Sequence, residues 1–597
     1  MIHRFLRRII TLSSENMDIK TSEITQEISP QRIQEQSPLS PRRITFFGEG
    51  VIVLLLALIA FFPRLLLAMR LDMVTDEVVY ILGGKLYFPL LAHLQIGSSQ
   101  WHYNYEHPPL VKLLIGLSLT LNSAVGHPLS DLFAARLPSI LMGTVLVVAL
   151  YWLARAPFGR VVALTAALCL AVSPWLVYFS ALAYLDMTMT ALITIAYLLT
   201  WYAIRRPWLY VVIALLVGLG ADSKYTAVLV IPGIVLFTAY YFFVIRQRIP
   251  VEQRPPLPWR WWVGAIILAP LAFLIADPAI WPNPPVLLVQ SFLFEWDHSH
   301  NGHLTFLAGK DYLHVPHWAI LYIILSKMSA FVTIPAAFFA VMGLVQLVRF
   351  QMKKITVEET TNISFLWIWL VSILGMFSLL NIVVGTHYHL PMAAPVALSG
   401  AVGLASILRY RRGSLVTLFT RQTNKPTTQR ISPTPSVSRP SRALRIYPLV
   451  AVTLLGLALF VPHLIGLTTV YGAEGYTSEF FPSENSVLQV AYPGYREGVQ
   501  WIATQTRGQE QVGLTALQGT LSNGRDGVSW YNFNSDLPSR LKLSEAHPDS
   551  TYLQYDYLVW PMHLIQRGYS PPKNWHHHVV HQIMGGSTIY CYILTNV

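Results

Sequence analysis

Residues 72–112 read DMVTDEVVYILGGKLYFPLLAHLQIGSSQWHYNYEHPPLVK, and we expect the rest of the chain to be organised around this stretch. Two adjacent carboxylates, Asp76 and Glu77, follow an apolar segment that ends near residue 68. Such a pair beside a membrane span is either a solvated boundary or a catalytic group, and the pair alone does not separate the two. The remainder of the chain has to decide between them.

The composition indicates a membrane protein with many spans. Of 597 residues, 53% are hydrophobic and only 12% are charged, whereas charged residues make up roughly a quarter of a soluble domain. The net charge of +12 comes from Lys and Arg in short clusters between apolar runs. That pattern orients membrane spans and does not indicate nucleic-acid binding. Cys169 lies in an apolar run and Cys591 in a polar segment, so no disulfide between them is expected.

The basic clusters also predict where the chain crosses the membrane. A span needs about 20 apolar residues, and Lys and Arg collect on the cytoplasmic side. Residues 1–45 are predicted to be a disordered cytoplasmic leader, followed by an outward span at 46–68. The next basic boundary follows residues 134–154, so the apolar run 109–126 is predicted not to cross. This run is short and opens with two prolines, and we expect an interfacial or re-entrant helix within one outer loop, 69–133.

The same reasoning gives about 11 spans, with the N-terminus inside and the C-terminal domain outside. Besides 46–68 and 134–154, the predicted spans are 161–181, 187–204, 208–221, 226–245, 261–279, 318–348, 363–383, 390–408 and 446–468. Because the run 318–348 is too long for one span, we expect an interfacial helix carrying Lys327 before the crossing. A second outer loop is predicted at 280–317, a cytoplasmic linker at 409–445 and an extracytoplasmic α/β domain at 469–597. The predicted fold class is an all-α polytopic membrane protein with a small C-terminal α/β domain.

This topology gathers a set of ionisable side chains on the outer side of the membrane, where such groups are functional candidates. They are Asp76, Glu77, His107, Lys112, Asp186, Lys224, His298, His300, His303, Lys327, His387 and His389. Each has a structural alternative: Asp186 as a helix boundary, Lys224 as a turn charge and Lys327 as an interfacial anchor. Together the cations suit an anionic head group such as phosphate, and the carboxylates suit proton removal from a nucleophile. Transfer from a lipid-linked phosphate needs one base and a cationic clamp, without a covalent nucleophile.

The histidine-rich stretches carry weaker signals. His298, His300 and His303 lie beside Asp297 at a spacing that suits either a metal ion or substrate contact, and we favour substrate contact. The tract from Trp575 to His578 is interpreted as a surface feature. No P-loop or GxGxxG signature follows a strand, which argues against soluble nucleotide chemistry.

Five segments of the outer and membrane regions carry a family resemblance. They are Thr75-Asp76-Glu77, Glu106-His107-Pro108-Pro109-Leu110-Val111-Lys112, Ala135-Arg136-Leu137-Pro138-Ser139, Leu185-Asp186-Met187 and Gly220-Ala221-Asp222-Ser223-Lys224-Tyr225-Thr226. In this order they resemble the GT-C class of membrane glycosyltransferases. The likeness is to the dolichyl-phosphate-mannose protein mannosyltransferase family and its bacterial relatives, which include the aminoarabinose transferases of lipid A. The stretch 300–307 and the helix of Lys327 resemble the bacterial branch. The resemblance covers roughly residues 46–410.

The resemblance implies a GT-C transmembrane domain over 46–408 in the plasma membrane. It implies an inverting hexosyltransferase that moves a sugar, a mannose-like hexose, from a polyprenyl-phosphate carrier to an acceptor hydroxyl on a protein or lipid. No cofactor is implied as obligatory, and a divalent metal stays open. The implied catalytic residues are Asp76 as general base, Glu77 and Asp186. The implied substrate or phosphate contacts are His107, Lys112, Arg136, Lys224, His300, His303, Lys327 and His387.

Two departures from the family leave the acceptor open. No β-trefoil insert lies between the middle spans, which puts a protein acceptor in doubt, and no WWDYG-type signature is present, which disfavours a preassembled glycan. A transporter or flippase for polyprenyl-linked glycans is the alternative function, because the same cations would hold a phosphate. Transporters commonly contain internal repeats, and the sequence shows no convincing halves.

Overall fold

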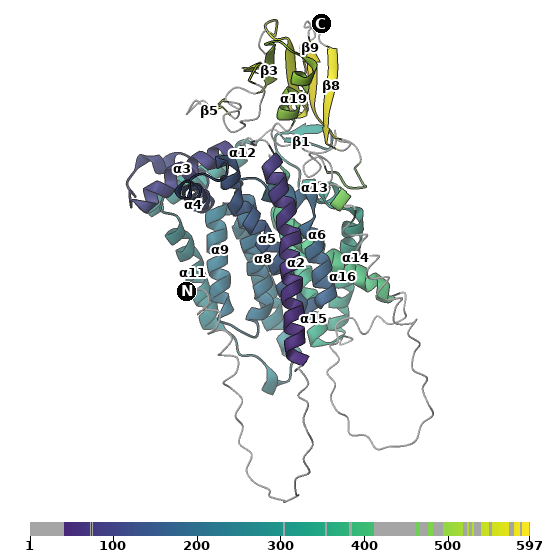
Figure 1. Ribbon diagram of the computed structural model, residues 1–597. Helices are drawn as coiled ribbons and strands as arrows, with labels where there is room; N and C mark the ends of the chain where they lie inside the picture. The colour runs from purple at the N-terminus through teal and green to yellow at the C-terminus, as the bar shows by residue number, and fades with distance from the viewer. Residues whose placement is uncertain are drawn as a thin grey trace, which may run out of the picture. The chain divides into compact units, whose positions relative to one another are not determined.

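The computed structural model describes residues 41–410, apart from short gaps at 72, 74–75, 303–304, 353–354 and 381–384, and parts of residues 461–595. Most of the described chain is helical. Its helices include α2 (Pro41–Arg70), α5 (Asp131–Phe158), α6 (Arg160–Ala171), α8 (Asp186–Ala203), α9 (Leu209–Ser223), α10 (Ile231–Tyr240), α11 (Trp259–Ala276), α14 (Ala330–Gln351), α15 (Val357–Phe377) and α16 (Ala393–Tyr410). In Figure 1 the helices α5, α6, α8, α9 and α16 run side by side, and α5 packs on α8 as α8 packs on α9.

Seven of the described helices are long and apolar enough to cross a membrane, or eight if the bent pair α6 and α7 (Pro174–Ser180) is one span. The seven are Gly48–Arg70, Asp131–Phe158, Tyr225–Arg248, Trp259–Ala276, Ala330–Gln351, Val357–Phe377 and Thr386–Leu408. The predicted spans at 187–204 and 208–221 fall on α8 and α9, which are not among the seven. The last predicted span, 446–468, lies mostly outside the described residues. A helical protein with many spans is confirmed, and the number 11 stays a prediction.

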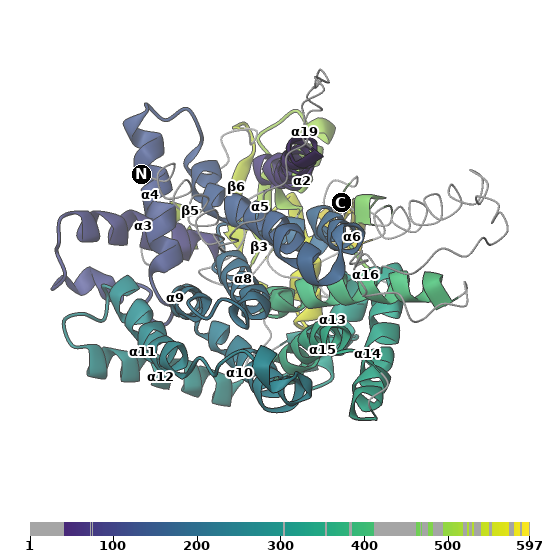
Figure 2. The same cartoon turned by 90° about the horizontal axis from the view of Figure 1, so that it is seen from below.

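Two shorter helices lie across the ends of the spans. They are α3 (Glu77–Ala92) and α4 (Leu110–Ala124), joined through η1 (Ser99–His102). In Figure 2, which looks along the spans, α8 and α9 are seen end-on while α3 and α4 lie in the plane of the view. The two helices pack closely because glycines meet: a Cβ atom at Gly116 would overlap the Gly84 carbonyl oxygen. Helix α4, which covers the predicted interfacial run, therefore lies across the spans and not alongside them.

The second predicted outer loop contains helix α12 (Pro284–Asn301) and an antiparallel hairpin of β1 (Thr305–Leu307) and β2 (Lys310–Tyr312). After it, α13 (Ala319–Lys327) stops at Met328 and α14 begins after Ser329, whose hydroxyl accepts a hydrogen bond from the Phe331 amide. The long apolar run 318–348 is thus two helices, as the sequence predicts.

Short segments of tighter or wider helix interrupt the region between α9 and α11 and precede α16. They are the 3-10 segments η2 (Tyr225–Val230), η4 (Arg246–Arg248), η5 (Val251–Gln253) and η6 (Thr386–Met392), and the π-helical segment η3 (Tyr241–Ile245).

A buried arginine closes the bend between α6 and α7, which is 59°. Arg64 of α2 has no exposed surface. Its Nη1 donates hydrogen bonds to the carbonyl oxygens of Ala60 (2.6 Å) and Ala171 (2.9 Å), and its Nη2 donates to Leu170 (3.3 Å). The last carbonyls of a helix have no partner within it. Arg64 supplies partners at the end of α6, which fixes the bend and the chain that leads to α8.

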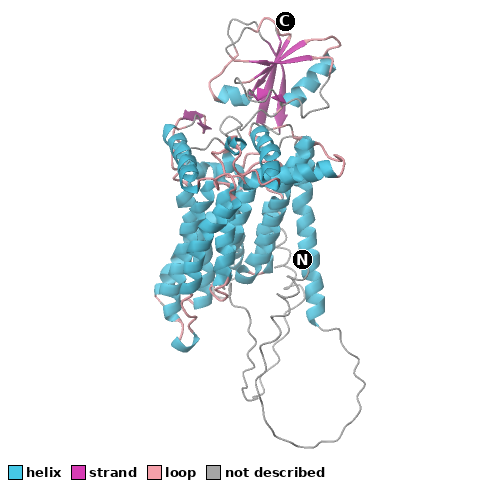
Figure 3. Ribbon diagram, turned by 90° about the vertical axis from the view of Figure 1, so that its left-hand side faces the viewer, coloured by secondary structure: helices cyan, strands magenta, loops and turns pink. Residues whose placement is uncertain are grey.

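The C-terminal domain is a small α/β unit built on a five-stranded sheet in the order β6-β3-β7-β9-β8. Strand β3 (Gln511–Thr515) pairs in parallel with β6 (Lys542–Ala546) and β7 (Tyr557–Pro561), and β9 (Thr588–Thr595) runs antiparallel to β7 and β8 (His578–Gly585). Figure 3 shows these strands side by side. Helices α19 (Tyr495–Gln505) and α20 (Met562–Gln566) complete the domain, and β4 (Ser522–Asn523) and β5 (Val528–Ser529) form a separate small ladder. The predicted α/β domain is confirmed.

Candidate functional site

The adjacent carboxylates Asp76 and Glu77 have opposite environments. Glu77 is the first residue of α3 and has no exposed surface. Its Oε1 accepts hydrogen bonds from Arg136 Nε (2.8 Å) and the Ala183 amide (2.8 Å), and its Oε2 accepts from Arg136 Nη2 (2.6 Å). Both carboxylate oxygens of Glu77 are thus held inside the protein.

Arg136 also bonds to the end of α2. Its Nη1 donates to the carbonyl oxygens of Ala68 and Leu71, both at 2.8 Å, and the side chain is fully buried. The pair with Glu77 therefore joins the end of α2, the start of α3, the body of α5 and the chain before α8. We interpret Glu77 and Arg136 as positioning residues. The catalytic and substrate-binding roles predicted for them have no support in this geometry.

Asp76 precedes α3 and keeps partial exposure. Its side chain makes no capping hydrogen bond to the helix. The surrounding protein still excludes enough water that burial raises the pKa of Asp76 above its usual value. The charges of His107, Lys224 and Arg567 oppose this rise in pKa, and the charge of Asp186 adds to it. Asp76 is thus a partly exposed carboxylate with a raised affinity for a proton and three basic side chains whose charges act on it.

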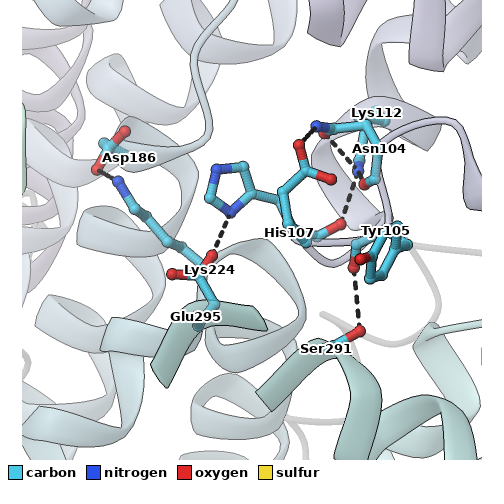
Figure 4. A network of polar contacts seen from close by, with 9 residues as sticks. Asn104, Tyr105, His107, Lys112, Asp186, Lys224, Ser291 and Glu295 are labelled. Atoms are coloured by element: carbon cyan, nitrogen blue, oxygen red, sulfur yellow. Dashed lines mark hydrogen bonds and ion pairs between the residues drawn. The ribbon is translucent and has the colours of Figure 1, made fainter. Parts of the chain in front are cut away.

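The predicted residues Asp186 and Lys224 meet as a buried ion pair. Lys224 Nζ lies 2.7 Å from Asp186 Oδ1, and Figure 4 shows the two side chains end to end. Asp186 is the first residue of α8, and Lys224 follows α9 in an extended conformation that carries its side chain back to α8. The ammonium also lies 3.9 Å from the centre of the Tyr388 ring. The charges of both residues act on Asp76, and their predicted roles in the site stay predictions.

His107 lies between this ion pair and a second group of polar contacts (Figure 4). Its Nδ1 is 3.2 Å from Glu295 Oε1, and its ring packs at 6.1 Å from the ring of Tyr80. Glu295 belongs to α12. The sequence does not single out Glu295, because one glutamate in an apolar helix has no spacing pattern, whereas the histidines of the loop 280–317 do.

Lys112 holds the turn that carries His107. The ammonium is buried, and its Nζ donates to the Asn104 carbonyl (2.6 Å), the Asn104 side-chain oxygen (2.9 Å) and the His107 carbonyl (2.6 Å). A lysine has three N–H donors, and all three are used here. Space for the side chain comes from Gly83, where a Cβ atom would lie 2.9 Å from Lys112 Cδ. Lys112 is therefore a positioning residue, and the predicted phosphate contact has no free donor.

Aromatic side chains line the same region. His387 of η6 is buried, with its ring 5.4 Å from that of Tyr184 and 4.7 Å from that of Tyr388. Tyr184 also meets Tyr80 edge to face at 5.9 Å. Of the predicted substrate contacts, His387 thus lies with the Asp186 and Lys224 pair. The tyrosines were missed because aromatic residues are frequent throughout the spans.

Four predicted residues lie apart from this group or have side chains outside the described residues. Lys327 donates from Nζ to the Tyr476 carbonyl at 3.2 Å. His300 is exposed near the end of α12, and His303 lies outside the described residues, as does the side chain of His298. Among the residues that the structure describes, no group of three or more His, Cys, Asp or Glu side chains could hold a metal ion.

A family comparison matches a segment that contains part of this site. Residues 106–253 match the family model described as dolichyl-phosphate-mannose-protein mannosyltransferase. The matched segment includes His107, Lys112, Arg136, Asp186 and Lys224. The resemblance predicted from the sequence is confirmed for this segment. A comparison with curated proteins found no match.

Several solved structures also align with the chain. ArnT from Cupriavidus metallidurans in the apo state is 16% identical, with a TM-score of 0.44, over 93% of this chain and 98% of that one. The same protein bound to undecaprenyl phosphate is 15% identical, with a TM-score of 0.43, over 92% and 98%. The apo oligosaccharyltransferase of Archaeoglobus fulgidus is 12% identical, with a TM-score of 0.43, over 87% of this chain and 70% of that one.

Proposed function

We propose, on the premise of the mannosyltransferase family match over residues 106–253, that this integral membrane protein is an inverting glycosyltransferase. In this proposal it moves a mannose-like hexose from a polyprenyl-phosphate carrier to an acceptor hydroxyl, on a protein or a lipid, at the outer membrane face. The observation that carries the proposal is the partly exposed Asp76 carboxylate, whose pKa is raised and on which the charges of the paired Asp186 and Lys224 act.

Asp76 acts as the general base. It accepts the proton of the acceptor hydroxyl while the acceptor oxygen forms a bond to the anomeric carbon. The bond from that carbon to the phosphate oxygen breaks, and its electron pair leaves with the polyprenyl phosphate. A single displacement of this kind inverts the anomeric configuration. A base with a raised pKa takes the proton more readily than an ordinary carboxylate, which suits a weakly acidic hydroxyl.

Lys224 stabilises the departing phosphate. Asp186 takes one hydrogen bond from its ammonium, at 2.7 Å, and a lysine has three N–H donors. The remaining donors suit phosphate oxygens, where a preorganised cation in a water-poor site lowers the barrier. Asp186 then orients the ammonium, and His107, held by Glu295, flanks the same space.

Product analysis tests the proposal. Purified protein in lipid nanodiscs is given a panel of polyprenyl-phosphate sugars with peptide or lipid acceptors, and products are identified by mass. We expect a glycosylated acceptor of inverted configuration, and transfer below detection with Asp76→Asn. The matched control is Asp131→Asn, a substitution of a partly exposed aspartate that pairs with Lys85 at 2.8 Å. It should keep activity.

Two outcomes would contradict the proposal. Full transfer by the Asp76→Asn protein would show that Asp76 is not the general base. Movement of the carrier-linked sugar across the bilayer without formation of a glycosidic bond would instead support a flippase.

A further inference from the structure

A cavity of about 450 Å³ opens at the far end of α8 from Asp186. Helix α8 has 18 residues, so the cavity lies about 27 Å from that residue at 1.5 Å per residue. Its walls come from the end of α8, the segment after α10 and the start of α15. The lining residues include Trp201, Ile204, Arg205, Arg248, Glu358 and Asn362.

Four arginines lie in or next to the segments that line this cavity. Two of them donate hydrogen bonds to backbone carbonyls, and two do not. Arg254 donates from Nε to the Ile249 carbonyl at 2.7 Å, and Arg246 donates from Nε to the Pro255 carbonyl at 2.7 Å. Among the described residues, the guanidinium groups of Arg205 and Arg248 make no hydrogen bond or ion pair, although both line the cavity. Each lies 5.5 Å from an aromatic ring. The turn is thus fixed by one pair of arginines, and the other pair is left to face the cavity.

The cavity wall is prebuilt by buried polar contacts. Trp201 Nε1 donates to the Asn362 side-chain oxygen at 2.8 Å. The Asn362 amide nitrogen in turn donates to the Pro157 carbonyl at 2.9 Å, and Asn362 is only 3% exposed. Because these groups already have partners, the wall keeps its shape without a ligand. The carboxylate among the lining residues, Glu358, is exposed and leaves an excess of one positive charge.

We propose that this cavity binds a phosphate-bearing anion, at a site separate from the transfer site. Arginine presents a planar set of donors that matches phosphate geometry, and the volume falls within the range of small-ligand sites. The apolar side chains of Ile204, Ile249 and Val357 beside the arginines suit the glycerol and upper acyl region of a lipid. The ligand is a phosphate group, carried by an anionic lipid or free in solution.

Native mass spectrometry of the full-length protein tests this site without any sugar donor, so its result is independent of the transferase proposal. Delipidated protein is mixed with equal amounts of phosphatidylglycerol and phosphatidylcholine, and in a second arm with inorganic phosphate. Arg205→Gln and Arg248→Gln are compared with Arg206→Gln, a neighbouring exposed arginine that does not line the cavity.

We expect wild-type protein to retain phosphatidylglycerol over phosphatidylcholine. Each cavity variant should lose this retention by about tenfold, since one charge-assisted contact is removed, and Arg206→Gln should bind as wild type. Binding of inorganic phosphate that depends on Arg205 and Arg248, without a lipid preference, assigns the site to free phosphate. The proposal is overturned if the wild type shows neither a preference for phosphatidylglycerol nor binding of inorganic phosphate. It is also overturned if all three variants lose binding equally.

Discussion

Lys112 and Lys224 have the same charge and similar burial, yet their contacts assign them different roles. Lys112 donates three hydrogen bonds to oxygens of Asn104 and His107, in the loop that precedes its own helix. Lys224 shares one with Asp186 and faces the ring of Tyr388. The first geometry builds a turn, and the second leaves a cation beside the proposed base.

Replacement by methionine should separate these two roles. Lys224→Met is expected to reduce kcat by about 100-fold or more, the loss typical of a removed transition-state contact, with a modest change in Tm. Lys112→Met should lower Tm clearly, because it removes three hydrogen bonds and leaves buried oxygens without a donor. Transfer rates at saturating donor and thermal shift in the same detergent measure both. Equal effects of the two variants would contradict the assignment.

The pH dependence of transfer should reflect the raised pKa of Asp76. The base must be ionised to accept a proton, so the rate should fall tenfold per pH unit below its folded pKa. The midpoint should lie above that of an ordinary aspartate. A profile of kcat/KM from acidic to neutral pH measures it. A rate that stays constant down to the usual range of aspartate would be inconsistent with Asp76 as the base.

The same group should lower stability at neutral pH. Because the folded-state pKa of Asp76 is raised, the folded protein binds this proton more tightly than the unfolded chain, and stability decreases as pH rises through that range. Asp76→Asn should therefore raise Tm at neutral pH, and the advantage should shrink as the pH falls below the folded pKa. Thermal shift of both proteins across pH tests this, and it also shows that the inactive variant is folded.

At the scale of secondary-structure elements, the buried pair of Glu77 and Arg136 fixes where α3 begins. Removing one partner leaves a buried charge alone, which typically costs about 3–5 kcal/mol. Glu77→Ala and Arg136→Ala should each destabilise the protein strongly, and the double variant should lose less than the sum of the two. Chemical unfolding or thermal shift of the four proteins gives the coupling between the residues. Additive losses would show that the pair does not act as a unit.

Some elements could be predicted from the sequence, and others could not. The break after Lys327 follows from length alone, since 318–348 exceeds one span. The placement of α4 across the spans was suggested by its prolines and short length. The helix α12 inside a predicted loop, and Glu295 on it, carry no signal of that kind, because most of its apolar side chains, such as Phe292 and Trp296, are exposed and show no clear buried face.

At the scale of the whole molecule, residues 476–481 bond to the junction of α13 and α14. Glu479 accepts hydrogen bonds from the Ser329 hydroxyl (2.9 Å) and the Ala330 amide (2.7 Å) at the start of α14. Glu479→Ala should speed hydrogen exchange at Ala330 and in residues 476–481, because a capping contact is lost. Hydrogen exchange with mass spectrometry measures this, with Glu358→Ala as the control at the distant cavity. Unchanged exchange in both segments would show that the Glu479 hydrogen bonds do not stabilise this junction.

The composition of the site was also only partly predictable. Order along the chain and charge type singled out Asp186 and Lys224, which form an ion pair, and His107, which pairs with Glu295. The division into acting and positioning residues was not visible, because it depends on which donors are already used in the fold. Arg567 was missed for a related reason: its charge acts on Asp76 from a residue almost five hundred positions away in the chain.

The pair of Glu77 and Arg136 also sets an order on biosynthesis. Its partners are made 59 residues apart, and the Ala183 amide that completes the carboxylate's bonding follows Glu77 by 106 residues. A nascent chain that has not yet passed residue 183 carries a carboxylate without its full set of donors. Until the segment before α8 has been made, the start of α3, and with it the position of Asp76, is held by Arg136 without the hydrogen bond from the Ala183 amide.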